Sequence, residues 1–303
     1  MVTLVDQVRG GQPWLWKPKY TYDAAPLISN FQKCIRRQLV EPALATAKQL
    51  LAQDASTFLR RLAIVLLEDA LLQPAIYAQV AWLMAAVGKK YTLTVEDVQV
   101  IMDSIVTALD AGERYDLQAE AEGAASEERH WLSSEPQSGY TVRSAYAGIR
   151  LRALAGGMKF DSAFMERLAR RILARQLQFQ SEVSTVEIDD IPEFSVAEHM
   201  QTAAIDFHCC PQLLEIVRLE SGLKAAIVQD AIWWHRSSLN ERTSPDSTTT
   251  YERAERFKTS QTWAQIARTV STYAESRLRS LEEKKVRVGP TRTLDAWFKT
   301  GKV

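Results

Sequence analysis

Residues 56–74 read STFLRRLAIVLLEDALLQP, and this stretch decides the fold class. Its apolar side chains recur every three or four residues, which places them on one face of a helix. They are Leu59, Leu62, Ala63, Leu66 and Ala70. Ser56 is a suitable N-cap, because a serine hydroxyl accepts a hydrogen bond from a backbone N–H of the first turn. The stretch therefore predicts an amphipathic helix.

Helical spacing continues on both sides of this stretch. Before it, Glu41 and Pro42 mark the start of another predicted helix, since proline is tolerated in a first turn. After it, Thr94 and Asp97 have the spacing of a capping box, with aspartate in place of the usual Glu or Gln. Residues 25–116 are therefore expected to form one helical lobe.

The composition of the chain suggests further divisions. Residues 117–139 are rich in Ala, Glu, Ser and Gly, which favours a solvated linker or loop. Helical periodicity then resumes, and residues 140–284 are expected to form a second lobe that ends in one long helix. Residues 1–24 should form an irregular aromatic arm packed on the body. We predict an all-α, multi-helix array with two helical lobes at these boundaries and a flexible, basic C-terminal tail at 285–303.

Bulk properties exclude several kinds of protein. Lys plus Arg number 37 and Asp plus Glu number 37, so any attraction to nucleic acid must come from a local patch. Every uninterrupted apolar stretch, including residues 62–67, is far too short to cross a bilayer, and we expect no membrane partner. Three cysteines, two of them adjacent, favour a reducing compartment. We expect an intracellular protein, nuclear, cytoplasmic or organellar.

No recognisable catalytic motif is present. The chain lacks the Gly-x-x-x-x-Gly-Lys-Ser/Thr phosphate loop. Cys209 and Cys210 lie near His199 and His208, but adjacent cysteines cannot easily place both sulfurs on one tetrahedral ion. We interpret that region as helix-start packing, and residues 189–190 as part of a solvated acidic loop. The sequence therefore predicts no enzyme activity, no cofactor and no metal site.

One part of the first lobe has a familiar arrangement. A helix with serine, lysine and arginine precedes an alanine-rich helix, and a helix with Arg-Arg-Leu and Glu-Asp follows. The positions concerned are Ser29, Lys33, Ala43, Ala45, Ala47, Arg60, Arg61, Leu62, Glu68 and Asp69. Residues 27–74 resemble the helical region behind the ATPase module of clamp-loader-like AAA+ proteins that maintain replication forks. Because the nucleotide-binding module is missing, the resemblance implies a helical collar that forms oligomers or presents partner surfaces.

Several basic residues have two interpretations. Arg60 and Arg61 suit structural ion pairing between neighbouring helices, or contact with DNA phosphates or a partner. Arg236 and Arg242 lie near tryptophans, and suit either packing at a helix end or a phosphate or single-strand contact. Both alternatives stay open for each pair.

Residues 291–298 read TRTLDAWF. This segment resembles the PIP box, a peptide motif that binds the sliding clamp PCNA. The positions with the spacing of that motif are Thr291, Leu294, Trp297 and Phe298. That pattern is Gln, two residues, an aliphatic, two residues and two aromatics. One helical turn would place Leu294 and Trp297 on the same side, where they can fill one apolar pocket. Thr291 stands where the family prefers Gln, and Trp297 where it prefers Phe or Tyr, so weaker docking is expected.

Positive charge surrounds this motif. Six basic residues oppose only Asp295 in residues 284–303, a local net charge of +5, and such charge speeds encounter with an acidic partner. They are Lys284, Lys285, Arg287, Arg292, Lys299 and Lys302. The first four are also candidate DNA or partner contacts.

The resemblance to the PIP box leads to one functional hypothesis. It is a non-enzymatic accessory factor of DNA replication or repair that docks on the sliding clamp through its tail, with DNA contacted directly or through partners. Oligomers are compatible with the collar. The alternative is a helical scaffold or assembly subunit unrelated to DNA, with the tail aromatics folded back on the body.

Overall fold

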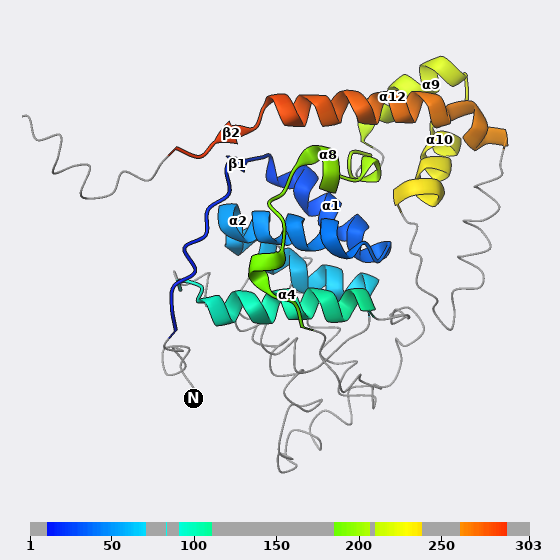
Figure 1. The fold of residues 1–303 in the computed structure, drawn as a ribbon. Helices are drawn as coiled ribbons and strands as arrows, with labels where there is room; N and C mark the ends of the chain where they lie inside the picture. The colour runs from blue at the N-terminus through cyan, green and yellow to red at the C-terminus, as the bar shows by residue number, and fades with distance from the viewer. Residues whose placement is uncertain are drawn as a thin grey trace, which may run out of the picture.

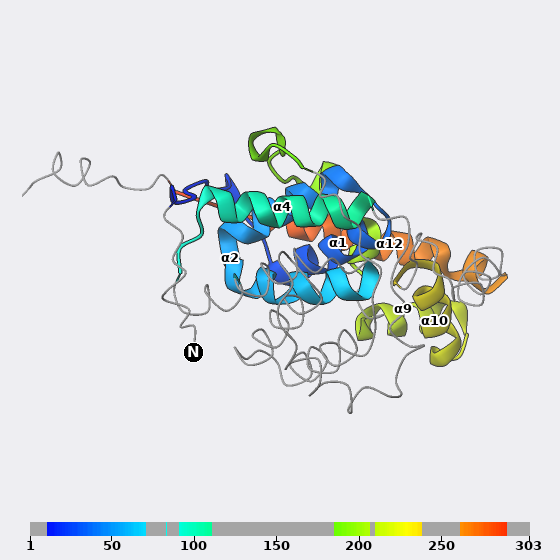
Figure 2. The ribbon, with the colours of Figure 1, turned by 90° about the horizontal axis from the view of Figure 1, so that it is seen from below.

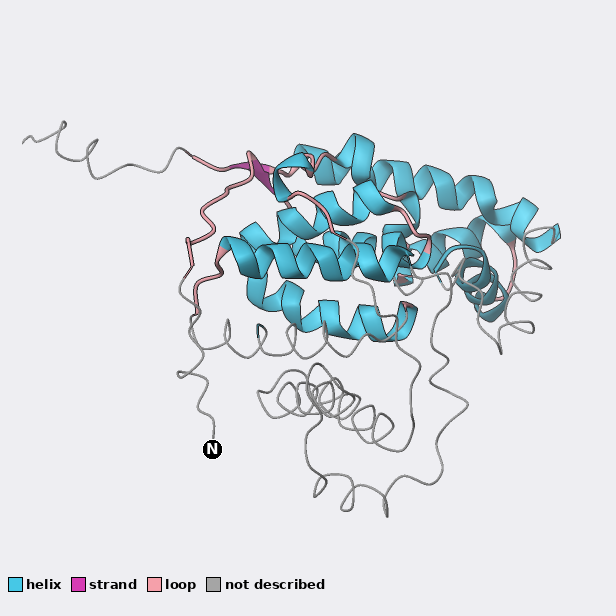
Figure 3. Ribbon diagram, turned by 60° about the horizontal axis from the view of Figure 1, so that its bottom comes forward, coloured by secondary structure: helices cyan, strands magenta, loops and turns pink. Residues whose placement is uncertain are grey.

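The computed structural model describes residues 11–70, 83, 91–110, 185–206, 210–237 and 261–289. Within these residues, the structure consists of helices and connecting loops, with one small pair of strands at the edge of the helical body (Figure 3). The predicted all-α class is confirmed. The linker expected at 117–139 lies outside the described residues.

The described elements follow one another from an N-terminal arm to a C-terminal strand. In chain order they are β1 (Tyr20–Thr21), α1 (Ala24–Arg36), α2 (Val40–Asp69), α4 (Val95–Asp110), η2 (Ile188–Asp190), α8 (Val196–His199), η3 (Thr202–Ala204), α9 (Pro211–Ser221), α10 (Ala225–Ile232), η4 (Trp233–Ser237), α12 (Gln261–Glu283) and β2 (Val286–Arg287). In Figure 1, α12 crosses one side of the molecule above α1, with α2 and α4 beneath. The view from below shows α2 and α4 side by side (Figure 2).

Two helix starts show how local hydrogen bonds set the boundaries. The capping box predicted at Thr94 and Asp97 is confirmed: each residue's backbone N–H donates to the other's side chain, at 2.9 and 3.2 Å. The cap expected at Ser56 is wrong. Asp54, at a kink within α2, accepts the hydrogen bond from the backbone N–H of Thr57 at 3.0 Å.

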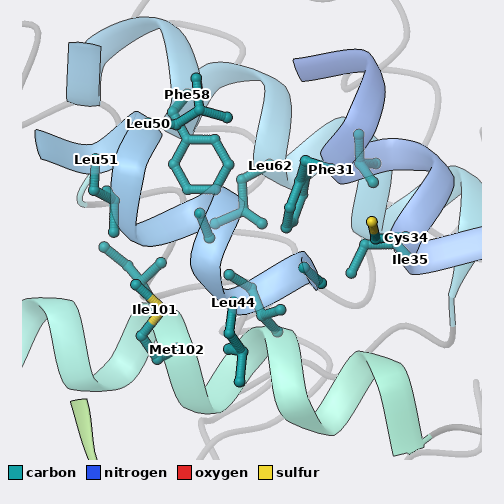
Figure 4. Close-up of a cluster of buried hydrophobic side chains, with 14 of the residues drawn as sticks. Phe31, Cys34, Ile35, Leu44, Leu50, Leu51, Phe58, Leu62, Ile101 and Met102 are labelled. Atoms are coloured by element: carbon teal, nitrogen blue, oxygen red, sulfur yellow. The ribbon is translucent and has the colours of Figure 1, made fainter. Parts of the chain in front are cut away.

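The first hydrophobic core lies where α1, α2 and α4 meet (Figure 4). Phe31 of α1 and Phe58 of α2 pack edge to face, with ring centroids 5.1 Å apart. Leu62 and Ile101 are also fully buried beside them. Burying each such side chain contributes roughly 1.5–3 kcal/mol to folding, so this core is the main source of stability for the three helices.

Residues from much later in the chain complete this first core. Ile188, Phe194, Val196 and Leu281 are buried in the same cluster as α1, α2 and α4. All four come from the range 140–284, which the sequence analysis assigns to the second lobe. The chain therefore returns to the first core through η2 and α8 and again at the end of α12.

A second, smaller core is formed by α9, α10 and the beginning of α12. Its buried residues are Leu213, Val217, Val228, Ala231, Ile232, Ile266 and Val270. Gly222 ends α9 with a positive φ of 69°, a conformation that favours glycine. Helix α12 contributes to both cores: Ile266 and Val270 enter the second core, and Leu281 enters the first. Helix α12 thus connects the two cores.

Candidate functional sites

The residues of the clamp-binding-like motif lie outside the described part of the chain. They are Thr291, Leu294, Trp297 and Phe298, together with the basic residues Arg292 and Arg242. The described chain stops at Gly289, which is exposed. The segment that precedes the motif is described, and it shows how the motif is attached to the body.

That attachment is a two-stranded antiparallel sheet, which we call the clasp. Tyr20 pairs with Arg287 and Thr21 pairs with Val286. The backbone N–H of Val288 extends the pairing by donating to the carbonyl of Lys19 at 3.0 Å. The clasp holds the end of α12 against the N-terminal arm, at the edge of the helical body (Figure 1).

Three of the basic residues singled out in the sequence lie at the clasp. Lys285 forms an ion pair with Glu282, and its ammonium lies 4.4 Å from the centroid of the Tyr20 ring. Lys284 and Arg287 are exposed. The latter two therefore present positive charge at the surface immediately before the motif.

The aromatic arm packs on the body, as expected. Trp14 and Trp16 stack with ring centroids 5.8 Å apart, and the ammonium of Lys48 lies 5.0 Å from the Trp16 ring. Trp14 and Tyr20 contact the first core. These rings contact one another, lysine side chains or the first core. Their arrangement therefore supports a packing role for the arm.

Arg60 and Arg61 have different environments on α2. Arg60 is exposed and donates back to Ser56, to its carbonyl at 3.1 Å and its hydroxyl at 2.6 Å. Arg61 is half-buried and donates to Oε1 of Gln32 on α1 at 3.3 Å. Arg61 therefore ties two helices together, whereas Arg60 stays on the surface, where a phosphate or a partner can reach it.

A cluster that the sequence did not reveal joins α1 to the end of η4. We call it the basic joint, and it consists of Lys33, Arg36, Arg37, Asp69, Asp206, Arg236 and Ser237. Nζ of Lys33 donates to the carbonyl of Ser237 at 3.0 Å. Arg36 donates to the same carbonyl, and Arg37 donates to that of Arg236. These carbonyls lie at the end of η4, and the donor groups of Lys33, Arg36 and Arg37 supply their hydrogen bonds.

Two buried carboxylates balance part of this charge. Asp69, at the end of α2, accepts from Nε of Arg36 at 2.7 Å and from Gln32 at 3.0 Å. Asp206 lies 2.8 Å from Nε of Arg236 and accepts from the Ser237 hydroxyl at 3.2 Å. Arg236 is only 8% exposed. This geometry supports packing at a helix end for Arg236, rather than contact with a phosphate.

Burial changes the titration of the basic joint. Removal from water, together with the neighbouring Arg36 guanidinium, lowers the pKa of Lys33 to about 7. Burial raises the pKa of Asp206, although Arg236 and Lys33 oppose that change. The sequence did contain a signal for part of this site, since Lys33 and Arg36 lie in the last turn of α1 and Arg37 is its C-cap. No local pattern pointed to Asp206 or Ser237.

His199 illustrates how the structure satisfies a histidine without a ligand. It is 1% exposed, and its Nδ1 accepts from the backbone N–H of Ser195 at 2.9 Å. Its ring also lies against that of Phe194. Among the described residues, no group of three or more His, Cys, Asp or Glu could hold a metal ion. His208 and Cys209 lie outside the described residues.

Comparison with known proteins adds no relative. The chain matches no known protein family, and neither the curated proteins nor the solved structures contain a significant match. Over the described ranges, no helix combines the length and the apolar character needed to cross a lipid bilayer.

Proposed function

We propose that the protein is a non-enzymatic accessory factor of DNA replication or repair that docks on a PCNA-like sliding clamp through residues 291–298. The observation that carries the proposal is the spacing of Thr291, Leu294, Trp297 and Phe298. An aliphatic and an aromatic side chain one helical turn apart can fill a single apolar pocket on a partner.

The attachment of this segment supports the proposal. The clasp holds the chain up to Val288, and Gly289 is exposed at the edge of the body. The motif begins at Thr291, shortly after this fixed point. Lys284 and Arg287 are exposed on the same approach, and their charge would steer an acidic clamp surface toward the motif.

Calorimetric titration of PCNA with a peptide of residues 284–303 tests the docking. Binding is expected, and Leu294→Ala with Phe298→Ala should abolish it by removing two of the three pocket-filling side chains. Thr293→Ala is the matched control, because Thr293 occupies a position that the motif leaves open. Absence of binding at high micromolar peptide, or equal binding by the double variant, would refute the proposal.

The full chain separates this function from the scaffold alternative. If the segment is accessible, the full chain and the peptide should bind the clamp with similar affinity. If Leu294, Trp297 and Phe298 are folded on the body, the full chain should bind much more weakly than the peptide. In that case, limited proteolysis should also leave residues 290–303 intact.

A further inference from the structure

The basic joint attaches the small helical pair α9–α10 to the first core. Lys33, Arg36 and Arg37 donate to carbonyls at the end of η4, which directly continues α10. Helix α12 also links the second core to the first. Opening of the basic joint would therefore release the end of α10, while the continuous helix α12 keeps the two cores connected.

Among the described residues, charged groups from α1, the end of α2 and the turn after η3 act on Lys33. Arg36 and Arg37 lie on its own helix, and Asp69 comes from the end of α2. Asp206, from the turn after η3, is the carboxylate that most favours the charged form of Lys33, and Arg236 of η4 pairs with Asp206. Four cations thus face two carboxylates among the described residues of this cluster. A proton on Lys33 adds positive charge beside the guanidinium groups of Arg36 and Arg37, in a place that is removed from water.

The joint also contains a polar atom whose bonding is incomplete. Nη2 of Arg236 is buried and has no hydrogen-bond partner among the described residues. Lys33 itself is 3% exposed. Water entering an opened joint would hydrate both groups, so opening has a physical benefit that grows when Lys33 is charged.

We infer that the basic joint is a pH-sensitive attachment of the α9–α10 pair, which tightens when Lys33 loses its proton and loosens when Lys33 gains one. This inference does not depend on clamp binding. The bond from Nζ to the Ser237 carbonyl survives deprotonation, because a neutral amine still donates. Repulsion from Arg36 and Arg37 disappears at the same time.

The direction follows from proton linkage. Lys33 has a pKa of about 7 in the closed joint, whereas a hydrated lysine has one of 10.5. Above pH 7, opening therefore takes up a proton, and each rise of one pH unit should lower the opening equilibrium by up to about tenfold until the hydrated value is reached. Acidification to pH 7 has the opposite effect.

Hydrogen exchange of the full chain, measured by mass spectrometry on peptides covering residues 225–237, tests the inference. Rates are divided by the intrinsic exchange rate at each pH. Between about pH 7.5 and 9.5, above the ordinary pKa of histidine, the opening equilibrium should fall by more than about tenfold. In this pH range, a change in opening can be assigned to Lys33 and not to His235, the neighbouring titratable side chain on η4. The His235 ring stacks on that of Trp263, with ring centroids 3.5 Å apart.

Two variants of Lys33 should shift the equilibrium in opposite directions. Lys33→Met removes the charge and should give a closed, pH-independent joint. Lys33→Arg retains a charge that is not lost in this range and should give an open, pH-independent joint. If Lys33 only holds the structure together, both variants should instead open the joint.

Lys48→Met is the matched control. Lys48 is also a buried lysine that donates to backbone carbonyls, those of Ile188 and Ile191, but it lies in the first core. This variant should keep the wild-type pH dependence in residues 225–237. A flat wild-type profile, or an unchanged slope in Lys33→Met, overturns the inference. If neither Lys33 variant folds, the wild-type profile together with Lys48→Met decides it.

Discussion

Thr21 and Val286 lie opposite each other in the clasp, although 265 positions separate them along the chain. The hydroxyl of Thr21 also donates to the Val286 carbonyl at 3.4 Å. This pair brings the aromatic arm to the end of α12. It also holds the chain up to Val288, shortly before the proposed clamp-binding segment begins.

Weakening the clasp should expose the basic residues around it. Tyr20→Ala removes the ring that lies under the Lys285 ammonium and contacts the first core. We expect a loss of about 1–2 kcal/mol in unfolding free energy, and faster cleavage by trypsin at residues 284–287. Leu15→Ala, in the same arm but 77% exposed, is the control and should leave both properties unchanged. Equal cleavage of the two variants would contradict this role of Tyr20.

The side chain of Asn30 should be essential for stability. Its Nδ2 donates to Thr46 at 2.8 Å and to the His199 carbonyl at 2.9 Å, and its Oδ1 accepts from the backbone N–H of Gln201 at 2.7 Å. Asn30→Leu would leave these buried partners unsatisfied, and we expect a loss of about 3–5 kcal/mol in urea denaturation. Thr46→Val removes one of the bonds and should cost only about 1 kcal/mol. Similar losses in the two variants would argue against this network.

The capping box of α4 provides a test of local structure. Oδ2 of Asp97 accepts from the backbone N–H of Thr94 at 2.9 Å and from the Tyr91 hydroxyl at 2.8 Å. Asp97→Ala should destabilise the protein by about 1–2 kcal/mol and reduce hydrogen-exchange protection in the first turn of α4. Exposed Glu96, in the same turn, supplies the control variant Glu96→Ala. The effect on α4 should be absent from the control.

Cys34 should resist alkylation until the protein unfolds. Its side chain is fully buried, and burial raises the pKa of the thiol to about 12. Iodoacetamide in native conditions should therefore modify Cys210 in preference, as read by mass spectrometry. Rapid modification of both cysteines would show that the first core opens easily.

The same thiol gives a stability effect with a defined sign. The ordinary pKa of 9.0 applies to the unfolded chain, so between pH 9 and 12 the unfolded state ionises while the native state keeps its proton. Stability contributed by the neutral thiol is present below pH 9 and falls as the pH rises toward 12. Cys34→Ala should remove this part of the pH dependence in denaturation curves.

Thr291→Gln should strengthen clamp binding. It supplies the residue that the PIP box prefers at its first position, where an amide can form polar contacts that a threonine cannot. One additional hydrogen bond would tighten binding about threefold to tenfold, measured by calorimetry with the 284–303 peptide. Thr293→Gln introduces the same side chain at an open position and should have no such effect. Unchanged affinity in Thr291→Gln would weaken the resemblance on which the function rests.

Local sequence determined most of the helices. The spacing of Leu59, Leu62 and Leu66 places these side chains on one side of α2, and all three are buried. The Thr94–Asp97 box marks the start of α4, because its bonds join residues within a single turn. Such features depend on neighbours three or four positions apart, so the chain specifies them before any tertiary contact forms.

Only the tertiary structure decided which distant segments meet. Thr21 pairs with Val286, and Lys33 contacts Ser237. The local sequence around each of these residues does not predict its partner. Likewise, Ile188 and Leu281 complete the first core from outside the predicted lobe. The hydrophobic effect is not directional, so many other apolar segments of the chain could cover a given apolar helix face equally well. The choice among them depends on the shapes of the packed helices and on which buried polar groups find partners.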